Sequence, residues 1–442
     1  MTAGPGLARQ GLRWAATHGM LRTAVRRRAR AGNVDAALLL DTARQQRPHP
    51  TYHRMRSEYP FADGAYPGSL VTVHHDVARA LLSGSDFAML DRRGSLPAPV
   101  KLALAVAGPR PGPGPLDPPS MLAVDGEPHR RYRRLVSRTF SARAVARLRT
   151  QAEEIAAGLL DTLEAEARGG PVDLVASYAS RLPVEMICSI LGVHRSMLPS
   201  LLRWGEGVAI ALDAGLSWSA FRRVEADLAA LHEWLGRHIA QVRADPGDDL
   251  LSRLATARDA EDGAMLDETE LAATAMLVLA AGFETTVTLL AGGTSVLLAH
   301  PDQRAVLAAE PSRWPNAVEE LLRVEPPVTR GARRALRDTE MCGREVCAGQ
   351  MVVPNISAAN RDPEVFAGPD IVDATRGNAR EHLAFSIGSH HCIGSGLARM
   401  EGEVGLRALF DRFPTLTAAG PATMRPTRLL RGYASLPVRL LS

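Results

Sequence analysis

The sequence predicts a mainly α-helical protein with a small β-rich portion, an α+β arrangement in one large catalytic unit. Residues 150–260 carry mostly amphipathic helix patterns. Residues 271–298 are almost wholly apolar, as in a helix buried through the middle of a protein. β-branched runs and prolines mark the β-rich portion near residues 69–80 and 326–356. Helices are therefore expected to form the body, with strands as a minor part.

Length and composition fit a large soluble enzyme. The chain has 442 residues, of which 46% are hydrophobic, enough to bury a sizeable core and a large apolar cofactor. No long polar linker divides it, so we expect a single catalytic domain over residues 48–442, preceded by a basic extension at residues 1–47. Four cysteines are too few for a disulfide framework in a chain of this length.

The net charge of +4 is modest and gives no case for a nucleic-acid partner, because no alternation of aromatic and basic residues accompanies it. We see no uninterrupted apolar run of the about 18 residues that a membrane-spanning helix needs. The N-terminus lacks the charged start, apolar stretch and cleavage site of a secretion signal. We therefore expect a cytoplasmic protein without a transmembrane segment.

The basic extension has two interpretations. A helical stripe of apolar residues precedes a cluster of arginines at residues 26–30, and the stripe comprises Leu7, Trp14, Leu21 and Val25. The segment is either an amphipathic helix that lies on an anionic membrane or a partner, or a helical extension packed on the enzyme body with its arginines in water. We favour the second interpretation.

A further helix is expected from Pro128, because proline suits the first position of a helix. His129 and Arg133 are four residues apart and therefore share one face of it. Taken alone, a basic helix face of this kind is common and is usually only solvated.

The apolar central helix, expected from about residue 267 to residue 300, has one acidic interruption at Glu284. The small residues Ala281 and Gly282 precede it, and Thr285 follows it. A carboxylate in an apolar stretch is costly unless it pairs or functions, and an acid beside a hydroxyl suits proton delivery through water. The structural alternative is a threonine bonded back to the preceding turn and a glutamate in a salt bridge.

Glu320 and Arg323 are three residues apart on the next expected helix, where an exposed pair would contribute roughly a few tenths of a kcal/mol. Prolines 326 and 327 then end the helix and begin an extended region. In that region Arg333 and Arg334 are adjacent, so on a strand they point to opposite faces.

One cysteine, Cys392, lies in a glycine-flanked loop at residues 385–394, and a helix follows at once. A thiolate held in this way can be the axial ligand of a haem iron, where its electron donation favours O–O cleavage over oxygen storage. The order Phe-x-x-Gly-x-His-x-Cys-x-Gly-x-x-Leu-Ala-Arg-x-Glu resembles the haem-binding loop of the cytochrome P450 family. In this chain the pattern falls on Phe385, Gly388, His390, Cys392, Gly394, Leu397, Ala398, Arg399 and Glu401.

The resemblance extends over about residues 48–442 and implies a cytochrome P450 fold with the haem between the central helix and the cysteine loop. It implies Cys392 as the iron ligand. The other residues it places against the haem are Phe385, Gly388 and Gly394 in the loop, His129 and Arg133 for one propionate, Arg333 for the second, and His390 as a further propionate candidate.

Residues 280–286 resemble the Ala-Gly-x-Glu/Asp-Thr-Thr oxygen-activation element of the family. The resemblance implies that Thr285 stabilises dioxygen as it is activated and that Glu284 relays protons. Ala281 and Gly282 would admit the flat macrocycle, and Phe283 stands where many bacterial members carry histidine.

Glu320 and Arg323 match the Glu-x-x-Arg pair of the family, which implies a structural role in a buried network with the later loop around Asn378. Three positions depart from the family pattern and are expected to change only packing: Cys347, Val372 and Ser386. The Pro/Gly-rich stretch 91–120 is expected either to overhang the substrate pocket or to be a plain surface loop. Residues 211–218 are expected to form a lid-like connection between two helices.

We expect a soluble, bacterial-type haem-thiolate monooxygenase that inserts one oxygen atom from O2 into a hydrophobic small molecule, a secondary-metabolite intermediate, by hydroxylation or epoxidation. The cofactor is haem b, and electrons from NAD(P)H arrive through a separate ferredoxin and ferredoxin reductase, because the chain has no flavin or iron–sulfur motif. Arg376, Arg380 and Arg399 are candidates to receive an acidic partner. The alternatives are oxidative coupling or rearrangement, peroxide-driven oxidation, and a non-enzymatic haem-binding sensor.

Overall fold

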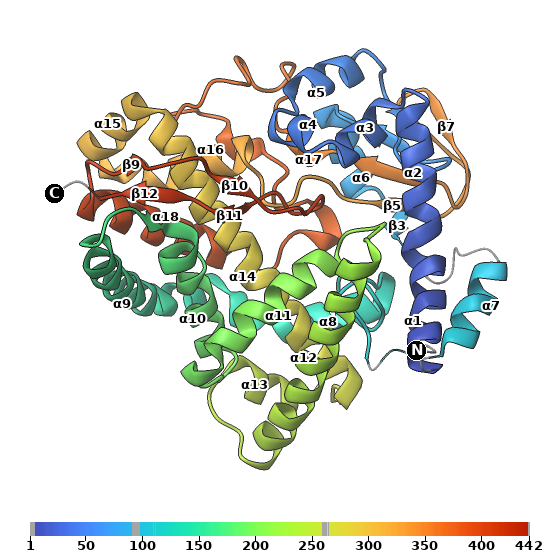
Figure 1. The fold of residues 1–442 in the computed structure, drawn as a ribbon, viewed down its shortest axis with the longest axis horizontal. Helices are drawn as coiled ribbons and strands as arrows, with labels where there is room; N and C mark the ends of the chain where they lie inside the picture. Colours follow the sequence, from blue (N-terminus) through green and yellow to red (C-terminus); the bar gives the residue numbers. More distant parts are fainter. Residues whose placement is uncertain are drawn as a thin grey trace.

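The computed structural model describes residues 5–90, 98–108, 110, 112–258, 263 and 265–440. Helices make up most of the body, and the short strands form small separate sheets in the upper half of the view (Figure 1), so the expected mainly α fold is confirmed. The main helices are α1 (Pro5–Trp14), α2 (Met20–Arg30), α3 (Val34–Leu40), α4 (Thr42–Gln46), α5 (His49–Arg56), α6 (His75–Ser83), α7 (Ala98–Ala107), α8 (Gly126–Ser137), α9 (Ala142–Ala167), α10 (Arg181–Ile190), α11 (Leu198–Ala211), α12 (Trp218–Ala244), α13 (Leu250–Thr256), α14 (Glu268–Ala299), α15 (Pro301–Ala309), α16 (Trp314–Val324), α17 (Ile356–Ala359) and α18 (Ser395–Arg412).

The strands are short. They are β1 (Ala62–Asp63), β2 (Leu70–Thr72), β3 (Phe87–Met89), β4 (Val172–Asp173), β5 (Arg333–Ala335), β6 (Thr339–Met341), β7 (Arg344–Val346), β8 (Met351–Pro354), β9 (Thr417–Ala418), β10 (Thr423–Met424), β11 (Tyr433–Ser435) and β12 (Pro437–Arg439). The largest sheet has the order β1-β2-β8-β5-β3. β2 and β8 pair in parallel and the other neighbours pair antiparallel, so the two predicted β-rich stretches do meet in one sheet.

Part of the predicted β portion is wrong. Residues 75–80, which belong to the predicted stretch 69–80, are part of the helix α6 rather than of a strand. Its buried apolar side chains have helical spacing, whereas a strand would bury every second residue: Val77, Ala78, Leu81 and Leu82. The small sheets formed by β4, β9 and β12 and by β10 and β11 were not predicted.

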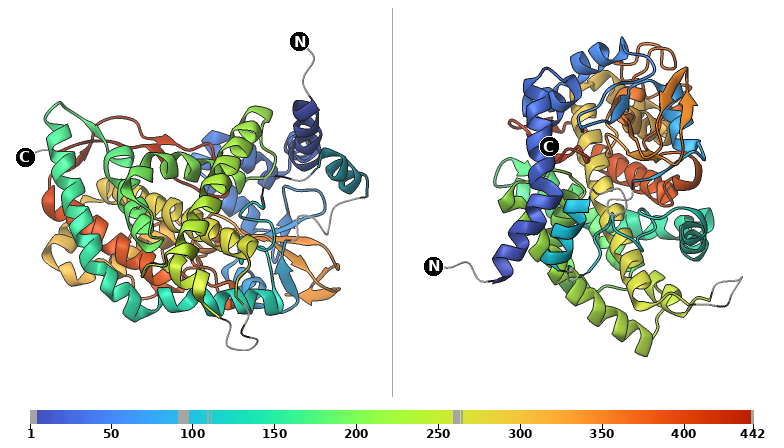
Figure 2. Two further views of the ribbon diagram at one scale, coloured as in Figure 1. Left: turned by 90° about the horizontal axis from the view of Figure 1, so that it is seen from below. Right: turned by 90° about the vertical axis from the view of Figure 1, so that its right-hand side faces the viewer.

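The central helix α14 runs through the middle of the body, as predicted (Figures 1 and 2). It begins with a capping box, in which Asp267 accepts from the Glu270 amide and the Glu270 side chain accepts from the Asp267 amide. By length and composition α14 is apolar enough to cross a membrane, although its most apolar window is 83% buried inside the protein. The sequence analysis did not count this helix because Glu284 interrupts the apolar run.

The N-terminal segment is helical. The helices α1 and α2, joined by a π-helical turn at Ala15–Gly19, form an extended rod at the margin of the molecule (Figure 1). Arg13 Nη1 donates to Glu225 Oε2 of α12 at 2.8 Å. The indole of Trp14 donates to the Leu216 carbonyl at 2.9 Å, which attaches the rod to the connection between α11 and α12.

Candidate active site

The cysteine loop leads directly into α18. The Cys392 amide donates to the Phe385 carbonyl at 2.8 Å, which closes the loop, and the Ser395 amide donates to the Cys392 carbonyl at 3.3 Å as α18 begins. Burial raises the pKa of the Cys392 thiol, while the Gly394 amide and nearby arginine charges act in the opposite direction. The local positive charge would therefore favour a thiolate once a metal binds the sulfur.

Two loop residues adopt left-handed backbone conformations. Gly388 has φ +72°, and a Cβ there would lie 3.0 Å from the Leu82 carbonyl oxygen of α6, so the position requires glycine. Ser386, where the family usually has glycine, has φ +55°. Its buried Oγ has no hydrogen-bond partner within the described part of the chain. The expectation of a mere packing change at Ser386 is therefore wrong, because the substitution also strains the backbone.

Ser386→Gly is expected to stabilise the protein by about 1 kcal/mol, because glycine adopts the left-handed conformation without the Cβ clash. Urea denaturation of the purified protein measures the change. Ser137→Gly is the matched control: Ser137 has φ −61° at the end of α8, so the same substitution there should cost roughly 0.5–1 kcal/mol. Equal losses at both positions would contradict the strain at Ser386.

The residues predicted to hold the propionates come from α8, β5 and the cysteine loop. The rings of His129 and His390 lie with their centroids 4.2 Å apart. Burial, followed by the neighbouring His390 and Arg133, lowers the pKa of His129 to about 4, so its ring is neutral near neutral pH. Arg333 is 5% exposed, and burial lowers its pKa. The structure thus gathers these imidazole and guanidinium groups beside the loop.

The arginines of this group have few protein partners. Arg333 Nη1 donates to the Ala332 carbonyl at 3.1 Å. Among the described residues, neither Arg133 nor Arg333 forms an ion pair with a carboxylate. A buried or half-buried guanidinium without an anion is costly, and a carboxylate on a bound group would satisfy it. These two side chains therefore fit the propionates of a haem.

The sequence analysis missed Asp125. His390 Nε2 lies 2.9 Å from Asp125 Oδ1, and the Met89 amide donates to the other carboxylate oxygen at 2.9 Å. Burial acts to raise the pKa of Asp125, but the hydrogen bonds from His390 and Met89 and the charge of Arg333 lower it overall. Asp125 is the N-cap residue of α8, where an aspartate usually accepts from the first amides of the helix. Its side chain makes no such bond and instead binds β3 and the cysteine loop.

The middle of α14 has one accessible face. Ala281 is exposed and Thr285 is half-buried, whereas their neighbours Phe283, Glu284 and Thr286 are buried. Residues four apart lie on the same side of a helix. Because α14 packs against α18, which continues the cysteine loop, this face is where a flat cofactor would fit between the two elements.

Gly282 and Phe283 pack away from this face. A Cβ on Gly282 would lie 2.9 Å from Ile187 of α10. Glycine at this position therefore allows α14 to pack closely against α10. The ring of Phe283 fills the place of the missing side chain of Gly205 on α11, because a Cβ there would lie 1.8 Å from the ring. Phe283 is thus a packing residue between α14 and α11.

The hydrogen bonds of Thr285 and Glu284 match the structural alternative considered for this element. Thr285 Oγ1 donates to the Ala281 carbonyl at 2.6 Å. The Glu284 carboxylate accepts from Arg425 Nη1, and both side chains are largely buried. Burial raises the pKa of Glu284, and the Arg425 charge opposes this rise. Arg425 follows β10, 141 positions away, and no local signal in the sequence pointed to it.

Arg425→Gln is expected to raise the pKa of Glu284 further, since it removes the opposing charge. A carboxyl whose folded pKa lies above its unfolded pKa destabilises the protein as pH rises past the unfolded value. Stability should therefore fall by about 2 kcal/mol near neutral pH and by less at about pH 5, since one pKa unit corresponds to ~1.4 kcal/mol.

Urea denaturation at both pH values measures this difference. Glu284→Gln added to Arg425→Gln removes the titrating group and should remove most of the pH dependence. A loss that is equal at both pH values would show that Arg425 acts through packing alone.

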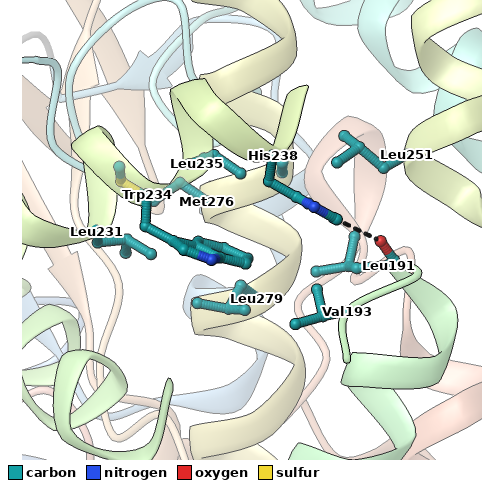
Figure 3. A pocket seen from close by; sticks show the side chains of 10 residues that line it. Leu191, Val193, Leu231, Trp234, Leu235, His238, Leu251, Met276 and Leu279 are labelled. Carbon is teal, nitrogen blue, oxygen red and sulfur yellow. Dashed lines mark hydrogen bonds between the residues drawn. The ribbon is translucent and has the colours of Figure 1, made fainter. Parts of the chain in front are cut away.

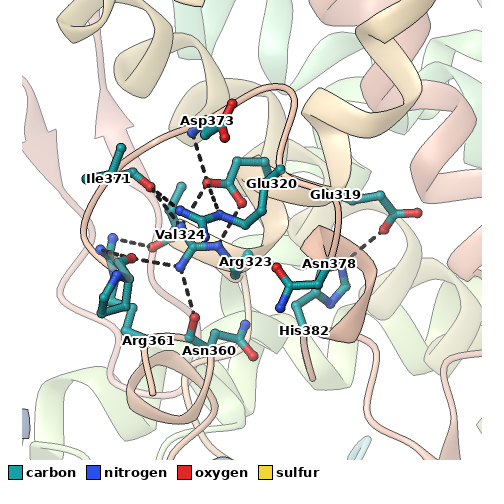
Figure 4. A network of polar contacts seen from close by, with 12 residues as sticks. Glu319, Glu320, Arg323, Val324, Asn360, Arg361, Ile371, Asp373, Asn378 and His382 are labelled. Atoms are coloured by element: carbon teal, nitrogen blue, oxygen red, sulfur yellow. Dashed lines mark hydrogen bonds and ion pairs between the residues drawn. The ribbon is translucent and has the colours of Figure 1, made fainter. Parts of the chain in front are cut away.

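Glu320 and Arg323 form the centre of a buried polar network (Figure 4). Their side chains are 1% and 0% exposed, and the guanidinium holds both carboxylate oxygens at 2.7 and 2.8 Å. Arg323 also donates to three loop carbonyls: Asn360, Pro369 and Ile371. Arg376 Nε and the Asp373 amide also donate to the Glu320 carboxylate, at 3.1 and 3.0 Å.

The expected network with the loop around Asn378 is present, and it forms through Asp373 and Arg376 rather than through Asn378 itself. Asn378 donates to the Val365 carbonyl, and the loop at residues 369–376 contacts the pair instead. Arg376 was a candidate for partner docking, but it is 9% exposed and belongs to this network. Arg380 and Arg399 both lie near buried Glu319, and their side chains are 74% and 35% exposed, so Arg380 is the more accessible of the two.

The pocket in Figure 3 is separate from this site. It lies between α10, α12, α13 and α14 and is lined almost wholly by apolar side chains, with His238 stacked on Trp234. Its volume of about 10 Å³ leaves room for no more than a water molecule. It is a packing gap between helices and contains none of the predicted site residues.

Comparison with known proteins agrees with this arrangement. The family model described as Cytochrome P450 matches residues 314–431. The putative cytochrome P450 140 of Mycobacterium tuberculosis is 44% identical over 430 residues, 97% of each chain. The chain belongs to the cytochrome P450 family. The match to the mycobacterial P450 leaves out only 3% of the chain, so it includes part of the N-terminal segment.

Two further cytochromes P450 are similar over most of their length. The vitamin D(3) 25-hydroxylase of Pseudonocardia autotrophica is 36% identical over 403 residues, 89% of this chain and 94% of the relative. The structure of the tirandamycin C-bound P450 monooxygenase TamI has a TM-score of 0.77 and 33% identity, and the match covers 91% of this chain and 99% of that one. This P450 is therefore a haem-thiolate monooxygenase that uses O2 and receives electrons from redox partners, as the sequence predicted.

Proposed function

We propose that this P450 inserts one oxygen atom from O2 into a large, mostly apolar small molecule, a secondary-metabolite intermediate, by hydroxylation or epoxidation. It does so in the cytoplasm with haem b, and electrons from NAD(P)H pass through a ferredoxin reductase and a ferredoxin. The observation that carries the proposal is the cysteine loop itself: the ring of His129 from α8 lies against His390 of the loop, and the charges of Arg133 and Arg399 act on the Cys392 thiol.

The residue assignments follow from that grouping. Cys392 would bind the iron; when bound, the haem supplies the chemistry of O–O cleavage that a thiolate ligand promotes. His129, Arg133, Arg333 and His390 would hold the two propionates through charge-assisted hydrogen bonds. The remaining loop contacts are Phe385, Gly388 and Gly394, and the contact from α14 is Ala281, because Gly282, also expected there, packs against Ile187 of α10 instead.

Proton delivery is the proposed role of Glu284 and Thr285. In the structure Glu284 is held by Arg425, and one of its oxygens, Oε1, is buried without a hydrogen-bond partner in the described residues. That free oxygen can accept or give a proton through water. The Thr285 hydroxyl lies on the accessible face of α14, where it can receive the proton and pass it on.

The substrate class rests on the relatives. One of them is named for the hydroxylation of vitamin D(3), and another was solved with tirandamycin C bound, so this P450 would accept a ligand of similar size. The accessible face of α14 presents the apolar side chain of Ala281. An apolar wall favours an apolar ligand.

A labelled-oxygen experiment tests the proposal. The reduced, carbon-monoxide-treated protein should show the red-shifted Soret band of a haem thiolate. With a substrate found by spectral titration, a ferredoxin system and ¹⁸O2, the product should contain one ¹⁸O atom. An oxidised product without label would instead favour coupling or rearrangement. Turnover with peroxide alone at the reductase-supported rate would favour the peroxide-driven alternative. Binding of the small molecule without any turnover would favour a haem-binding sensor.

A further inference from the structure

Nine large hydrophobic side chains are exposed among the described residues. Five of them lie on the rod of α1 and α2 and on the neighbouring helix α7. We call them the apolar face; they are Leu7 and Leu12 of α1, Met20 at the start of α2, and Leu102 and Val106 of α7. The helices α1 and α7 lie side by side at the margin of the molecule in Figures 1 and 2. Single exposed hydrophobics are normal on a soluble protein, but a cluster on adjoining helices marks an interaction surface.

The helix α7 is the stronger part of this observation. Nine of its ten residues are apolar, and Lys101 is its one charged residue. Only Val100 and Ala107 are buried, while Leu102 is 68% and Val106 is 61% exposed. A surface helix normally turns a polar face to water. The outward side of α7 is apolar instead, so its contact with water is unfavourable and burial of this side would stabilise the helix.

The charge around the apolar face has one sign. Residues 5–34 contain seven arginines and no acidic residue, since the first carboxylate along the chain is that of Asp35. The side chains of Arg9, Arg26, Arg27 and Arg30 are exposed. Within the described residues, none of these four pairs with a carboxylate. At the start of α12, next to the point where α1 is attached, two more arginines are exposed: Arg222 and Arg223.

An apolar centre with a basic surround matches the interface of an anionic bilayer, where acyl chains take the apolar side chains and headgroups take the arginines. A second copy of this chain would fit less well, because a symmetric contact would bring arginines against arginines. The segment is also firmly attached to the enzyme body: Arg13 pairs with buried Glu225, and Trp14 packs on Trp218 with ring centroids 5.8 Å apart. Docking would therefore orient the whole enzyme.

We propose that the apolar face docks on an anionic lipid surface, with α7 and the outer side of α1 entering the headgroup region and the arginines binding lipid phosphates. The enzyme would then lie on the membrane without crossing it. The contact places the connection between α11 and α12 near the bilayer, because the rod of α1 and α2 crosses that connection.

Vesicle co-sedimentation of the full-length protein tests this proposal. We expect the protein to pellet with vesicles of phosphatidylcholine and phosphatidylglycerol and to remain in solution with phosphatidylcholine alone. Leu102→Glu with Val106→Glu should weaken binding to the anionic vesicles by about tenfold or more, because two side chains would lose burial and gain repulsion. Leu336→Glu is the matched control, since Leu336 is 51% exposed outside the apolar face, and it should leave binding unchanged.

A second variant separates charge from apolar contact. Neutralising Arg26, Arg27 and Arg30 together with glutamine should also weaken binding by about tenfold or more, because each basic residue near the surface contributes ~1 kcal/mol. Far-UV circular dichroism confirms that each variant is folded. The proposal is overturned if the wild type binds neither vesicle, or if the Leu102/Val106 variant binds as well as the wild type. Self-association that this variant abolishes, without vesicle binding, would assign the face to a second copy of the chain and likewise overturn it.

Discussion

Cys392→Ser is expected to abolish oxygen insertion and to remove the red-shifted Soret band of the reduced, carbon-monoxide-treated protein. Serine keeps the size of the side chain and the loop hydrogen bond, because the Cys392 amide, and not the sulfur, donates to Phe385. It removes the electron-donating thiolate on which O–O cleavage depends. The change therefore isolates the iron ligand from the shape of the loop. Absorption spectra and turnover with a ferredoxin system measure it.

The chain provides matched controls for this substitution. Cys342 and Cys347 are free, exposed thiols in or beside the β6–β7 hairpin. Cys342→Ser and Cys347→Ser should leave both the spectrum and the turnover unchanged. If Cys392→Ser kept the red-shifted band, the iron would have another ligand, and the assigned roles of Glu284 and Thr285 would lose their basis.

Arg323→Ala is expected to destabilise the protein by about 3–5 kcal/mol, because it leaves the buried Glu320 carboxylate without its main partner. Three loop carbonyls would lose their donor as well. Since the loop at residues 369–376 leads to the cysteine loop, we expect haem retention to fall together with stability. Urea denaturation and the haem content of the purified protein measure the two effects.

An exposed pair of the same spacing serves as control. Arg313 Nε lies 2.9 Å from Glu310 Oε2, also three residues apart, but the side chains are 37% and 56% exposed. Arg313→Ala should change stability by no more than about 0.5 kcal/mol, because water replaces the lost partner. A similar loss at both positions would show that burial is not what makes the Glu320–Arg323 pair matter.

The parts of the site that the sequence predicted are those carried by local motifs. The thiol and the glycines of its loop lie within a few residues of one another, as do the acid and the hydroxyl of α14, so each group could be identified by its resemblance to a short motif of the family. The partners that complete the site lie far away in the chain: Arg425 reaches Glu284 across 141 positions and Asp125 reaches His390 across 265. Such contacts depend on how helices and loops pack, which a single sequence does not specify.

The fold was predictable to a similar extent. The long helices followed from hydrophobic periodicity and the two β-rich stretches from β-branched residues and prolines, whereas their pairing in one sheet is shown by the structure. The assignment of residues 75–80 to the β-rich portion was wrong because a short apolar run suits a strand and a helix alike. The sequence showed only that Phe283 stands where many bacterial members carry histidine, and the structure shows which helix its ring contacts.

That contact has a mechanical consequence. Because the ring of Phe283 sits where Gly205 has no side chain, α11 cannot slide along α14 without pushing the ring. Glu284 is the next residue along the chain and Thr285 follows it, so the push would reach the turn to which we assign proton delivery. A ligand that displaced α11 on binding would therefore also shift the turn of α14 that contains Glu284 and Thr285.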